Sequence, residues 1–237
     1  MGNVSERRKQ PPQVGVSVVI LALGPVPQSD VGAGAASSGM GSTLWMPLVK
    51  RVRQPFLGQW ALPGGGLRAD HSLEQSAYAA LESTTSLHPK YLEQLYTFGD
   101  PARSHGGLPM VSIVYWALVG EADGRIGGDN VKWFPVNHLP ELAFDHRTIV
   151  EYAMNRLRGK IESPDIATRL VGERFTLSQL HDVYEAIAGQ RIDLANFRRK
   201  MLASGLLEDT GEKLRIGRNR PAAVYRYSRK PGTDLWT

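Results

Sequence analysis

The sequence predicts an α+β protein built from two modules of different composition. Four runs of Val, Ile, Leu and aromatic residues in the first half are typical of β-strands. The second half instead carries apolar residues at helical spacing, followed by a basic hairpin. At 237 residues, the chain is long enough for two domains that each bury a core. We expect a disordered tail over 1–13, a first domain over 14–157 and a second over 158–237.

The composition excludes several classes of protein. Hydrophobic residues make up 42% and charged residues 22%, as is usual in globular proteins. The chain has no cysteine, which excludes disulfides and thiolate metal sites and agrees with a cytoplasmic location. A basic segment precedes an apolar run over 14–24, as in a signal peptide. That run is too short to span a bilayer, which takes ~20 residues, so we expect a buried strand and no membrane partner.

The first half predicts strands around one helix. Ser72 can cap a helix that runs to about Ser83, because Leu73, Ala77 and Leu81 recur on one of its faces. The preceding glycines, 64–66, predict a tight loop whose N–H groups can approach a phosphate. Residues 25–43 read as a Gly/Ala/Ser-rich loop. The predicted strands are 14–23, 44–53, 95–98 and 110–118.

The segment from Arg53 to Gly65, RQPFLGQWALPGG, with the helix after it resembles the loop–helix motif of Nudix hydrolases. The resemblance implies an α/β/α sandwich with a mixed sheet. The box of that family reads G-x5-E-x7-R-E-U-x-E-E-x-G-U, where U is a bulky aliphatic residue. With the first glycine on Gly65, the aliphatic positions fall on Leu81 and Leu87. The other signature positions depart from the family pattern and hold His71, Ala79, Ala80, Ser83, Thr84 and Ser86.

The missing glutamates decide what this domain can do. Hydrolysis of a nucleoside diphosphate linkage needs Mg²⁺ or Mn²⁺, and these cations prefer carboxylate oxygens. The helix supplies only Glu74 and Glu82, which lie about 80° apart around its axis and about two turns apart along it. They cannot converge on one ion, and we interpret them as solvated surface acids. The sequence therefore predicts a domain that is not an enzyme, binds no metal and requires no cofactor.

Such a domain can still bind a nucleotide. The segments 96–119 and 132–162 resemble the ADP-ribose-type branch of the Nudix family. An ADP-ribose ligand needs an apolar slot for its base, fixed hydrogen-bond donors and a cationic clamp. Arginines and glycine amides would bind phosphate or ribose, and aromatic rings would stack on the base. The candidate effector site comprises Arg53, Gly64, Gly65, Gly66, Phe98, Asp100, Arg103, Trp133 and Phe144.

Each of these candidates also has a structural interpretation. A single buried aromatic residue is more often part of the core, and Arg53 could be an ordinary surface arginine. Asp145 is expected to cap a helix whose first turn contains His146, for which we predict a structural role. The inner face of that helix would comprise Ile149, Val150, Ala153 and Leu157.

The second half predicts a helix-turn-helix. Residues 159–170 read as a linker helix or crossover. Thr176 and Gln179 have the spacing of a capping box for a helix that Gly189 ends. Asp193 caps a second helix, which Gly205 ends. The first helix would bury Leu177, Leu180, Tyr184 and Ile187, and the second Leu194, Phe197 and Met201.

The outer face of the second helix predicts contact with nucleic acid. It would present Asn196, Arg199, Lys200 and Ala203, whereas Arg198 lies near the apolar edge and should snorkel or pair with an acid. Strands over 206–208 and 223–227 would enclose a basic tip and complete a winged helix-turn-helix. The DNA-binding candidates are Asn196, Arg199, Lys200, Lys213, Arg215, Arg218, Asn219 and Arg220.

The charge distribution supports this prediction. The net charge of the chain is +5, and residues 191–230 hold eleven Lys and Arg against four Asp and Glu. A basic excess at one end is typical of nucleic-acid-binding proteins. Winged helices also serve as docking modules for proteins, and a basic face can simply be solvated. Both alternatives remain open at this stage.

From Val14 to Ser228, the chain resembles the Nudix-related transcriptional regulators of NAD metabolism. The resemblance implies a homodimeric repressor on a palindromic operator in double-stranded DNA, near genes of NAD biosynthesis or salvage. Its effector would be ADP-ribose or a related NAD-derived nucleotide. Two other classes remain: a weakly active Mg-dependent ADP-ribose pyrophosphatase, and an interaction protein that does not bind DNA.

Overall fold

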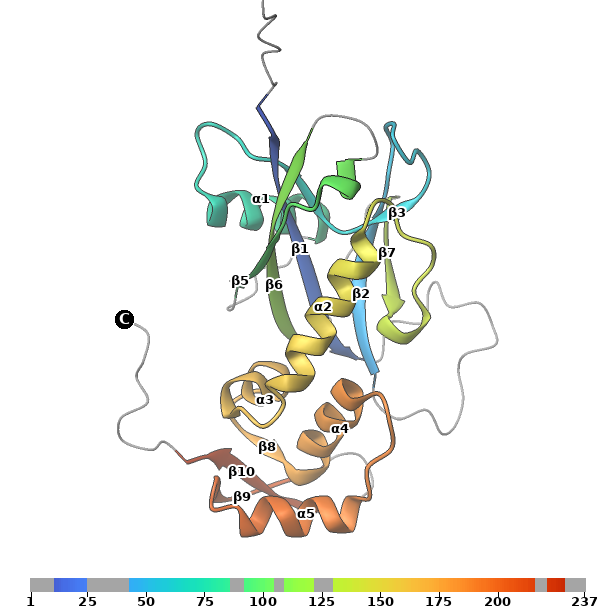
Figure 1. The fold of residues 1–237 in the computed structure, drawn as a ribbon. Coiled ribbons are helices and arrows are strands. Elements are labelled where there is room, and N and C mark those ends of the chain that lie inside the picture. Colours follow the sequence, from blue (N-terminus) through green and yellow to red (C-terminus); the bar gives the residue numbers. More distant parts are fainter. Residues whose placement is uncertain are drawn as a thin grey trace, which may run out of the picture.

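The computed structural model describes residues 11–24, 43–85, 92–104, 109–121, 130–215 and 221–228. A mixed sheet in the order β3-β2-β1-β6-β5 forms the first domain, with β4 paired to β1 and β7 to β2 (Figure 1). A smaller domain of helices and a three-stranded sheet lies at one end of it. The strands of the first sheet are β1 (Gln13–Gly24), β2 (Thr43–Lys50), β3 (Trp60–Ala61), β4 (Gly64–Gly66), β5 (Leu92–Phe98), β6 (Met110–Glu121) and β7 (Val131–Pro135).

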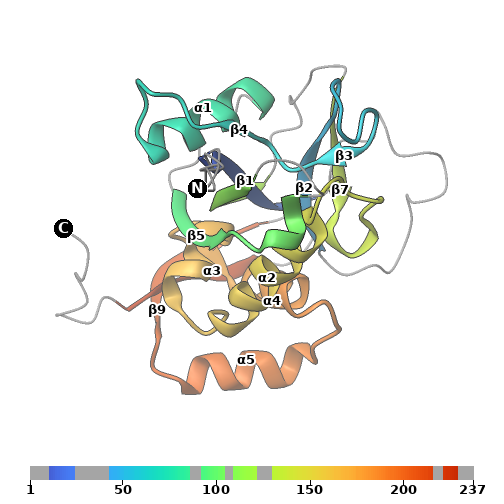
Figure 2. The same ribbon diagram turned by 45° about the horizontal axis from the view of Figure 1, so that its top comes forward.

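The central strands β1 and β6 are parallel, and both of their faces are buried. Alternate residues of a strand point to opposite faces. Val18 packs with Leu81 of helix α1 (Leu73–Thr85), whereas Leu21 packs with Ile149 of helix α2 (His146–Gly159). Figure 2 shows α1 on one side of the sheet and α2 on the other. The predicted α/β/α sandwich with a mixed sheet is confirmed.

The glycine run differs from its prediction. Gly64–Gly66 is not a loop but the short strand β4, which pairs antiparallel with residues 15–17 of β1. A Cβ atom on Gly64 would lie 2.5 Å from the carbonyl oxygen of Val16. The close approach of the two backbones therefore requires glycine at position 64. The predicted cap of α1 is present, because the amide of Gln75 donates to Oγ of Ser72 at 3.1 Å.

Other boundaries shift by a few residues. The second strand ends at Lys50 rather than at residue 53, because the backbone of Arg51 bonds to Gln59 and Gly58 and closes a loop. The predicted tail and the predicted loop at 25–43 lie outside the described residues, apart from 11–13 and Thr43. The short helices η1 (Pro101–Ser104) and η2 (Val136–His138) complete this domain. None of the described helices is long and apolar enough to cross a membrane.

The second domain has the predicted winged helix-turn-helix fold. The capping box of Thr176 and Gln179 opens α4, and Gly189 ends that helix with a φ of 70°. Asp193 caps α5, whose Phe197 and Met201 are buried. Leu194, predicted to face inward, is 36% exposed because it begins the helix at the rim of the core. The elements are α3 (Pro164–Val171), α4 (Leu177–Ala188), α5 (Leu194–Ala203), β8 (Phe175–Thr176), β9 (Leu207–Leu214) and β10 (Ala222–Tyr227).

Helices α3 and α4 contribute to two cores at once. Leu170 of α3 and Ile187 of α4 are buried in the core beneath the sheet, together with residues of α2. Ala167 of α3 and Leu180 of α4 belong to the core of the winged helix, with Phe197. The segment predicted as a linker or crossover is indeed helical over 164–171, but it is packed on both sides. The two domains are therefore joined by continuous apolar contacts.

Candidate ligand site and nucleic-acid interface

The β4 glycines offer fewer free amides than the sequence suggested. The amide of Leu67 donates to Val14, and that of Val18 donates to Pro63. Bonded and non-bonded pairs alternate along an antiparallel ladder, so the intervening Val16–Gly65 pair is also a bonded one. The amide of Gly65 is thereby directed at β1, and those of Gly64 and Gly66 are directed away from it. All three glycines are exposed, and two amides remain to meet a ligand.

The acids of α1 lie as the sequence suggested. Glu74 and Glu82 are both exposed. Among the described residues, the group of three side chains close enough to ligate a metal is His181, Asp182 and Glu185, in α4 rather than in α1. Two of these three side chains already bond to backbone atoms of Ile192. We therefore interpret the group as a structural contact.

Arg103 is held in a buried ion pair. Its guanidinium donates to both carboxylate oxygens of Asp145 at 2.9 Å and to the carbonyl of Phe98 at 2.7 Å. The Arg103 side chain is only 4% exposed. The sequence assigned Arg103 to phosphate or ribose, but the charge is satisfied within the protein. Asp145 stands at the N-cap position of α2 and, because it pairs with Arg103, makes no side-chain cap bond.

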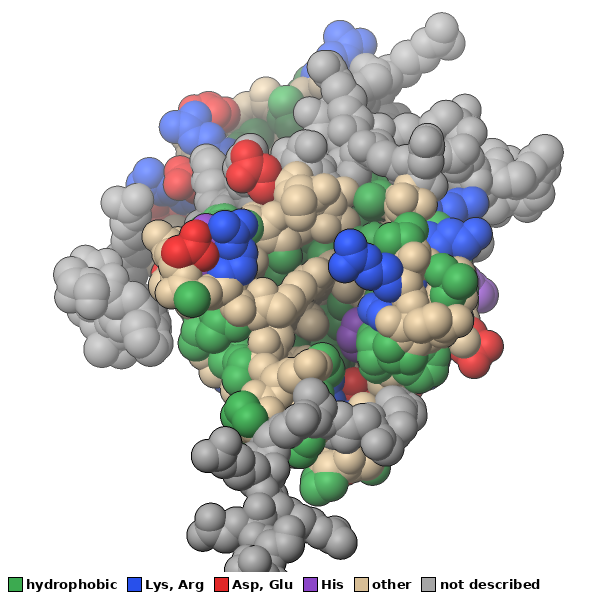
Figure 3. Space-filling view, turned by 90° about the horizontal axis from the view of Figure 1, so that it is seen from above, with side chains coloured by type: hydrophobic (Ala, Val, Ile, Leu, Met, Phe, Trp, Pro, Cys, Tyr) green, Lys and Arg blue, Asp and Glu red, His purple; other side chains and the backbone are tan. Residues whose placement is uncertain are grey.

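Phe144 lies at the centre of an aromatic and cationic cluster at this end of the domain. Its ring is 4.8 Å from that of Phe56, and the guanidinium of Arg51 lies 4.5 Å from its centroid. Partial burial lowers the pKa of Arg51, which still remains charged at neutral pH. Figure 3 shows this end from above, with Lys and Arg side chains beside hydrophobic ones. Arg53, the arginine that the sequence suggested here, is exposed, and the arginine that contacts the ring is Arg51.

The structure brings together only part of the predicted effector set. Phe98, Asp100 and Arg103 lie close together, since Arg103 bonds to the backbone of the other two. Phe144 lies next to them, because it directly precedes Asp145, the partner of Arg103. Trp133 lies apart from them, because it packs against the core on the α1 side of the sheet. Phe98 packs against the core on the α2 side, and its ring contacts Tyr96 and Tyr152.

His146 fastens the start of α2 to the link between β3 and β4. Its Nδ1 atom accepts a hydrogen bond from the amide of Leu62 at 3.0 Å, which requires the neutral ring. Burial lowers the pKa of His146 to about 4, so the ring stays neutral in the folded protein at pH 7. The residue is structural here, as the sequence indicated.

Helix α5 presents a polar face to solvent. Asn196, Arg199 and Lys200 are all exposed, opposite the buried Phe197 and Met201. Arg199 donates to the amide oxygen of Asn196 at 2.6 Å, and Lys200 lies 3.3 Å from Glu162. Arg198, predicted to snorkel or to pair with an acid, is exposed and bonds to the hydroxyl of Ser178 at 3.0 Å. Asn and Arg on such a face can bond to base edges in a major groove.

Two side chains of α4 fix the turn before α5. The amide of Ile192 donates to Glu185 at 2.8 Å, and its carbonyl accepts from Nε2 of His181 at 2.8 Å. Glu185 is 5% exposed. Since Ile192 precedes the cap residue Asp193, these bonds set the direction in which α5 leaves the turn. Sequence reasoning missed both residues, because their partners are backbone atoms.

The wing is a pair of antiparallel strands, β9 and β10. The first runs over Leu207–Leu214 and is longer than the predicted 206–208. Lys213 and Arg215 are exposed near its tip, whereas Arg218, Asn219 and Arg220 lie outside the described residues. Acids balance part of the charge, as in the 2.6 Å pair of Arg174 with Glu212.

Comparison with protein-family models gives two matches. Residues 33–153 match the NUDIX domain, and residues 167–227 match the "NrtR DNA-binding winged helix domain". An "ADPR responsive transcriptional repressor NtrR" from Acinetobacter baylyi is 32% identical over 188 residues, which cover 76% of this chain and 74% of that protein. An ADP-ribose pyrophosphatase from Methanocaldococcus jannaschii is 33% identical over 114 residues, covering 47% of this chain and 67% of that protein.

A solved structure shares the arrangement of both domains. The crystal structure of Shewanella oneidensis NrtR complexed with a 27mer DNA superposes with a TM-score of 0.66 at 33% identity. The match covers 91% of this chain and 93% of that chain. The similarity therefore extends through the junction at α3 and α4 and is not confined to one domain.

The Arg103–Asp145 pair should be important for stability. Arg103→Ala leaves a partly buried carboxylate without its partner, which costs ~3–5 kcal/mol. We expect a loss of that order in the free energy of unfolding, measured by urea denaturation. Arg68→Ala is the matched control, because the Arg68–Asp70 pair is 65% exposed on both sides and should contribute little. Equal effects of the two changes would contradict this role.

The buried His146 should make stability depend on pH. Its folded pKa lies below the unfolded value, so protons bind preferentially to the unfolded chain as the pH falls. Stability should be retained above pH ~6.5 and decline by up to about 3 kcal/mol as the pH approaches 4. His146→Asn keeps an acceptor for the amide of Leu62 but does not titrate, so this decline should be smaller in that variant. Identical pH profiles in urea denaturation would refute the assignment.

Proposed function

This chain belongs to the family of Nudix-related transcriptional regulators, and on that premise we propose that it is a DNA-binding repressor whose Nudix domain senses ADP-ribose or a related NAD-derived nucleotide. The observation that carries the proposal is the polar outer face of α5, which is held on a winged helix-turn-helix. The A. baylyi repressor and the DNA complex of the S. oneidensis protein support it, because both relatives align through both domains.

We propose further that the protein acts as a homodimer on a palindromic operator near genes of NAD biosynthesis or salvage. Two copies of α5 would then enter successive major grooves, ~34 Å apart. Lys213 and Arg215 of the wing would contact phosphate beside each groove, together with the predicted tip residues Arg218, Asn219 and Arg220. A ligand that changes the spacing of the two helices would weaken binding without turnover.

The site for the effector is proposed at the end of the sandwich that holds the exposed glycines and the Phe144 cluster. The amides of Gly64 and Gly66 and the guanidinium groups of Arg51 and Arg53 suit a diphosphate. Phe144 suits a base, because its ring is only partly buried and aromatic rings stack on one another. Arg103 and Asp145 would shape this site from beneath rather than contact the ligand.

We propose that the Nudix domain does not hydrolyse its ligand. Glu74 and Glu82 are exposed and about two turns apart on α1, where they do not form a shared metal site. The similarity to the M. jannaschii pyrophosphatase motivates the alternative of a weak hydrolase. AMP release from ADP-ribose in Mg²⁺ or Mn²⁺ that is lost in Glu74→Gln and Glu82→Gln would establish that alternative.

ADP-ribose should alter DNA binding by the full-length protein. Genomic DNA fragments retained by the protein supply the operator, and fluorescence anisotropy measures affinity with and without ADP-ribose. A coupling of ~1–3 kcal/mol predicts an affinity ~5–150-fold lower with the ligand. An operator affinity that does not change over a wide ADP-ribose range would refute the sensor role while leaving DNA binding intact.

The outer face of α5 should carry the affinity for DNA. Arg199→Ala and Lys200→Ala should each weaken binding by ~1–3 kcal/mol if the side chain contacts a base, with the fold retained by circular dichroism. Affinity should also fall steeply with salt. Arg68→Ala, which removes an exposed arginine of the other domain, is the control. Undiminished binding by both α5 variants would place the interface elsewhere, and no salt-sensitive binding at all would favour a protein-docking module.

A further inference from the structure

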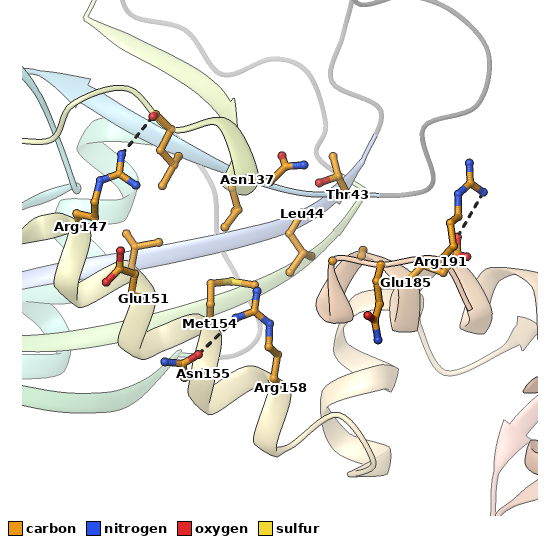
Figure 4. Close-up of a pocket in the computed structure, with 16 residues that line it drawn as sticks. Thr43, Leu44, Asn137, Arg147, Glu151, Met154, Asn155, Arg158, Glu185 and Arg191 are labelled. Atoms are coloured by element: carbon orange, nitrogen blue, oxygen red, sulfur yellow. Dashed lines mark hydrogen bonds and ion pairs between the residues drawn. The ribbon is translucent and has the colours of Figure 1, made fainter. Parts of the chain in front are cut away.

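A pocket of about 550 Å³ lies between the two domains, and Arg51, Phe56 and Phe144 do not line it. One wall is helix α2 of the sandwich, and the opposite wall is the end of α4 with the turn after it (Figure 4). Its volume falls within the ~300–1,000 Å³ that is usual for small-molecule sites. The pocket therefore has the size of a ligand site and contacts both domains.

Three arginines line this pocket: Arg147 and Arg158 of α2, and Arg191 of the turn after α4. Two carboxylates, Glu151 and Glu185, also line it, which leaves one net positive charge. Of these carboxylates, Glu185 is buried and bonded to the amide of Ile192, so its charge is partly compensated. The wall charge therefore suits an anion, and guanidinium groups are well matched to phosphate oxygens.

Two of the arginines are oriented in advance by backbone carbonyls. Arg147 donates to the carbonyls of Leu139 and Pro140 at 3.2 and 2.9 Å. Arg158 donates through Nε to the carbonyl of Ile187 at 3.2 Å, and its terminal amino group lies beside Gly189. Groups that are already held in place lose little freedom on binding.

The rest of the lining suits the remainder of a nucleotide. Leu44, Val150, Met154 and Ala186 supply apolar surface, and Asn137, Asn155 and Gln190 supply amides for hydroxyl or ring atoms. Figure 4 shows Met154 and Arg158 side by side on α2, so apolar and cationic groups adjoin in the pocket. Small-molecule sites are typically apolar with a few fixed polar groups.

The pocket also contacts the turn that sets the direction of α5. Arg191 lies 3.8 Å from one carboxylate oxygen of Glu185, whose other oxygen accepts from the amide of Ile192. An anion near Arg191 would compete with Glu185 for that guanidinium. Ligand binding would therefore act on the segment that leads into the recognition helix.

We propose that this pocket binds a phosphate monoester of the size of a nucleoside monophosphate, and that its occupation alters how α5 is held. The proposal is independent of the ADP-ribose response proposed above. If ADP-ribose has no effect on DNA binding but the pocket binds a phosphate monoester through Arg158, the site proposed here stands and the ADP-ribose response does not.

Isothermal titration of the full-length protein with AMP tests the site. Arg158→Gln should weaken AMP binding about ten-fold or more, because it removes a charged hydrogen bond to the phosphate. Arg147→Gln should weaken binding less, because Arg147 lies ~16 Å from Arg158 along the axis of α2 and cannot share the same phosphate. Arg156→Gln is the matched control, since Arg156 is an exposed residue of the same helix that does not line the pocket. Adenosine, which lacks the phosphate, should bind at least about ten-fold more weakly than AMP.

A third variant, Arg191→Gln, tests the pocket without disturbing the packing of the two domains. Arg191 is 66% exposed on the turn, so Arg191→Gln leaves the contact between Arg158 and α4 intact. No AMP binding in the millimolar range overturns the site, as does unchanged affinity in all three variants or equal binding of adenosine. The second half of the proposal predicts that saturating AMP shifts DNA affinity about 5-fold or more in the parent protein and not in Arg158→Gln. An unchanged DNA affinity in the parent protein overturns that half.

Discussion

The shared apolar core at α3 and α4 is the constraint on which the arrangement of this protein depends. Leu170 and Ile187 complete the core beneath the sheet, although both belong to helices of the winged domain. The sheet face would otherwise expose apolar surface, which costs roughly 25 cal/mol per Å². The two domains therefore cannot separate freely. A change in their relative orientation must repack these shared apolar contacts.

The Arg103–Asp145 pair and His146 hold the other end of the layer that covers this face of the sheet, where α2 begins. Both contacts act on the first residues of α2, one through a carboxylate and the other through a ring nitrogen. They join η1 and the link between β3 and β4 to the helix that covers the sheet. The position of α2 therefore shapes the end of the sandwich that holds the exposed glycines. The start of α2 is in turn fixed by buried polar contacts that tolerate little change.

Local chemistry made much of this fold predictable. The Thr176–Gln179 capping box, the Asp193 cap and the stop at Gly189 follow from neighbouring residues, and each is present. The buried stripes of α1 and α2 follow from helical periodicity. The same reasoning misjudged Leu194, because periodicity says nothing about where the core ends.

The side chains with distant partners could not be predicted in this way. Arg103 and Asp145 are 42 residues apart, and no local pattern indicates that they pair. Arg51 acquires its place over Phe144 only when the loop after β2 folds back on the start of α2. The glycine run became a strand because β1 lies against it, which again is a tertiary effect. The site residues were therefore less predictable than the helices and strands.

These contacts together indicate how an effector at one end of the sandwich could reach α5 at the other. Helix α2 has 14 residues and spans ~21 Å, with Asp145 and His146 at its start. Near its end, Leu157 is buried in the shared core and Arg158 bonds to the carbonyl of Ile187. The next contact is within α4, where Glu185 holds the amide of Ile192. Packed helices shift as bodies rather than deform continuously. A displacement of α2 would therefore be transmitted to the turn before α5 through α4, and the chain connection over 160–163 need not carry it.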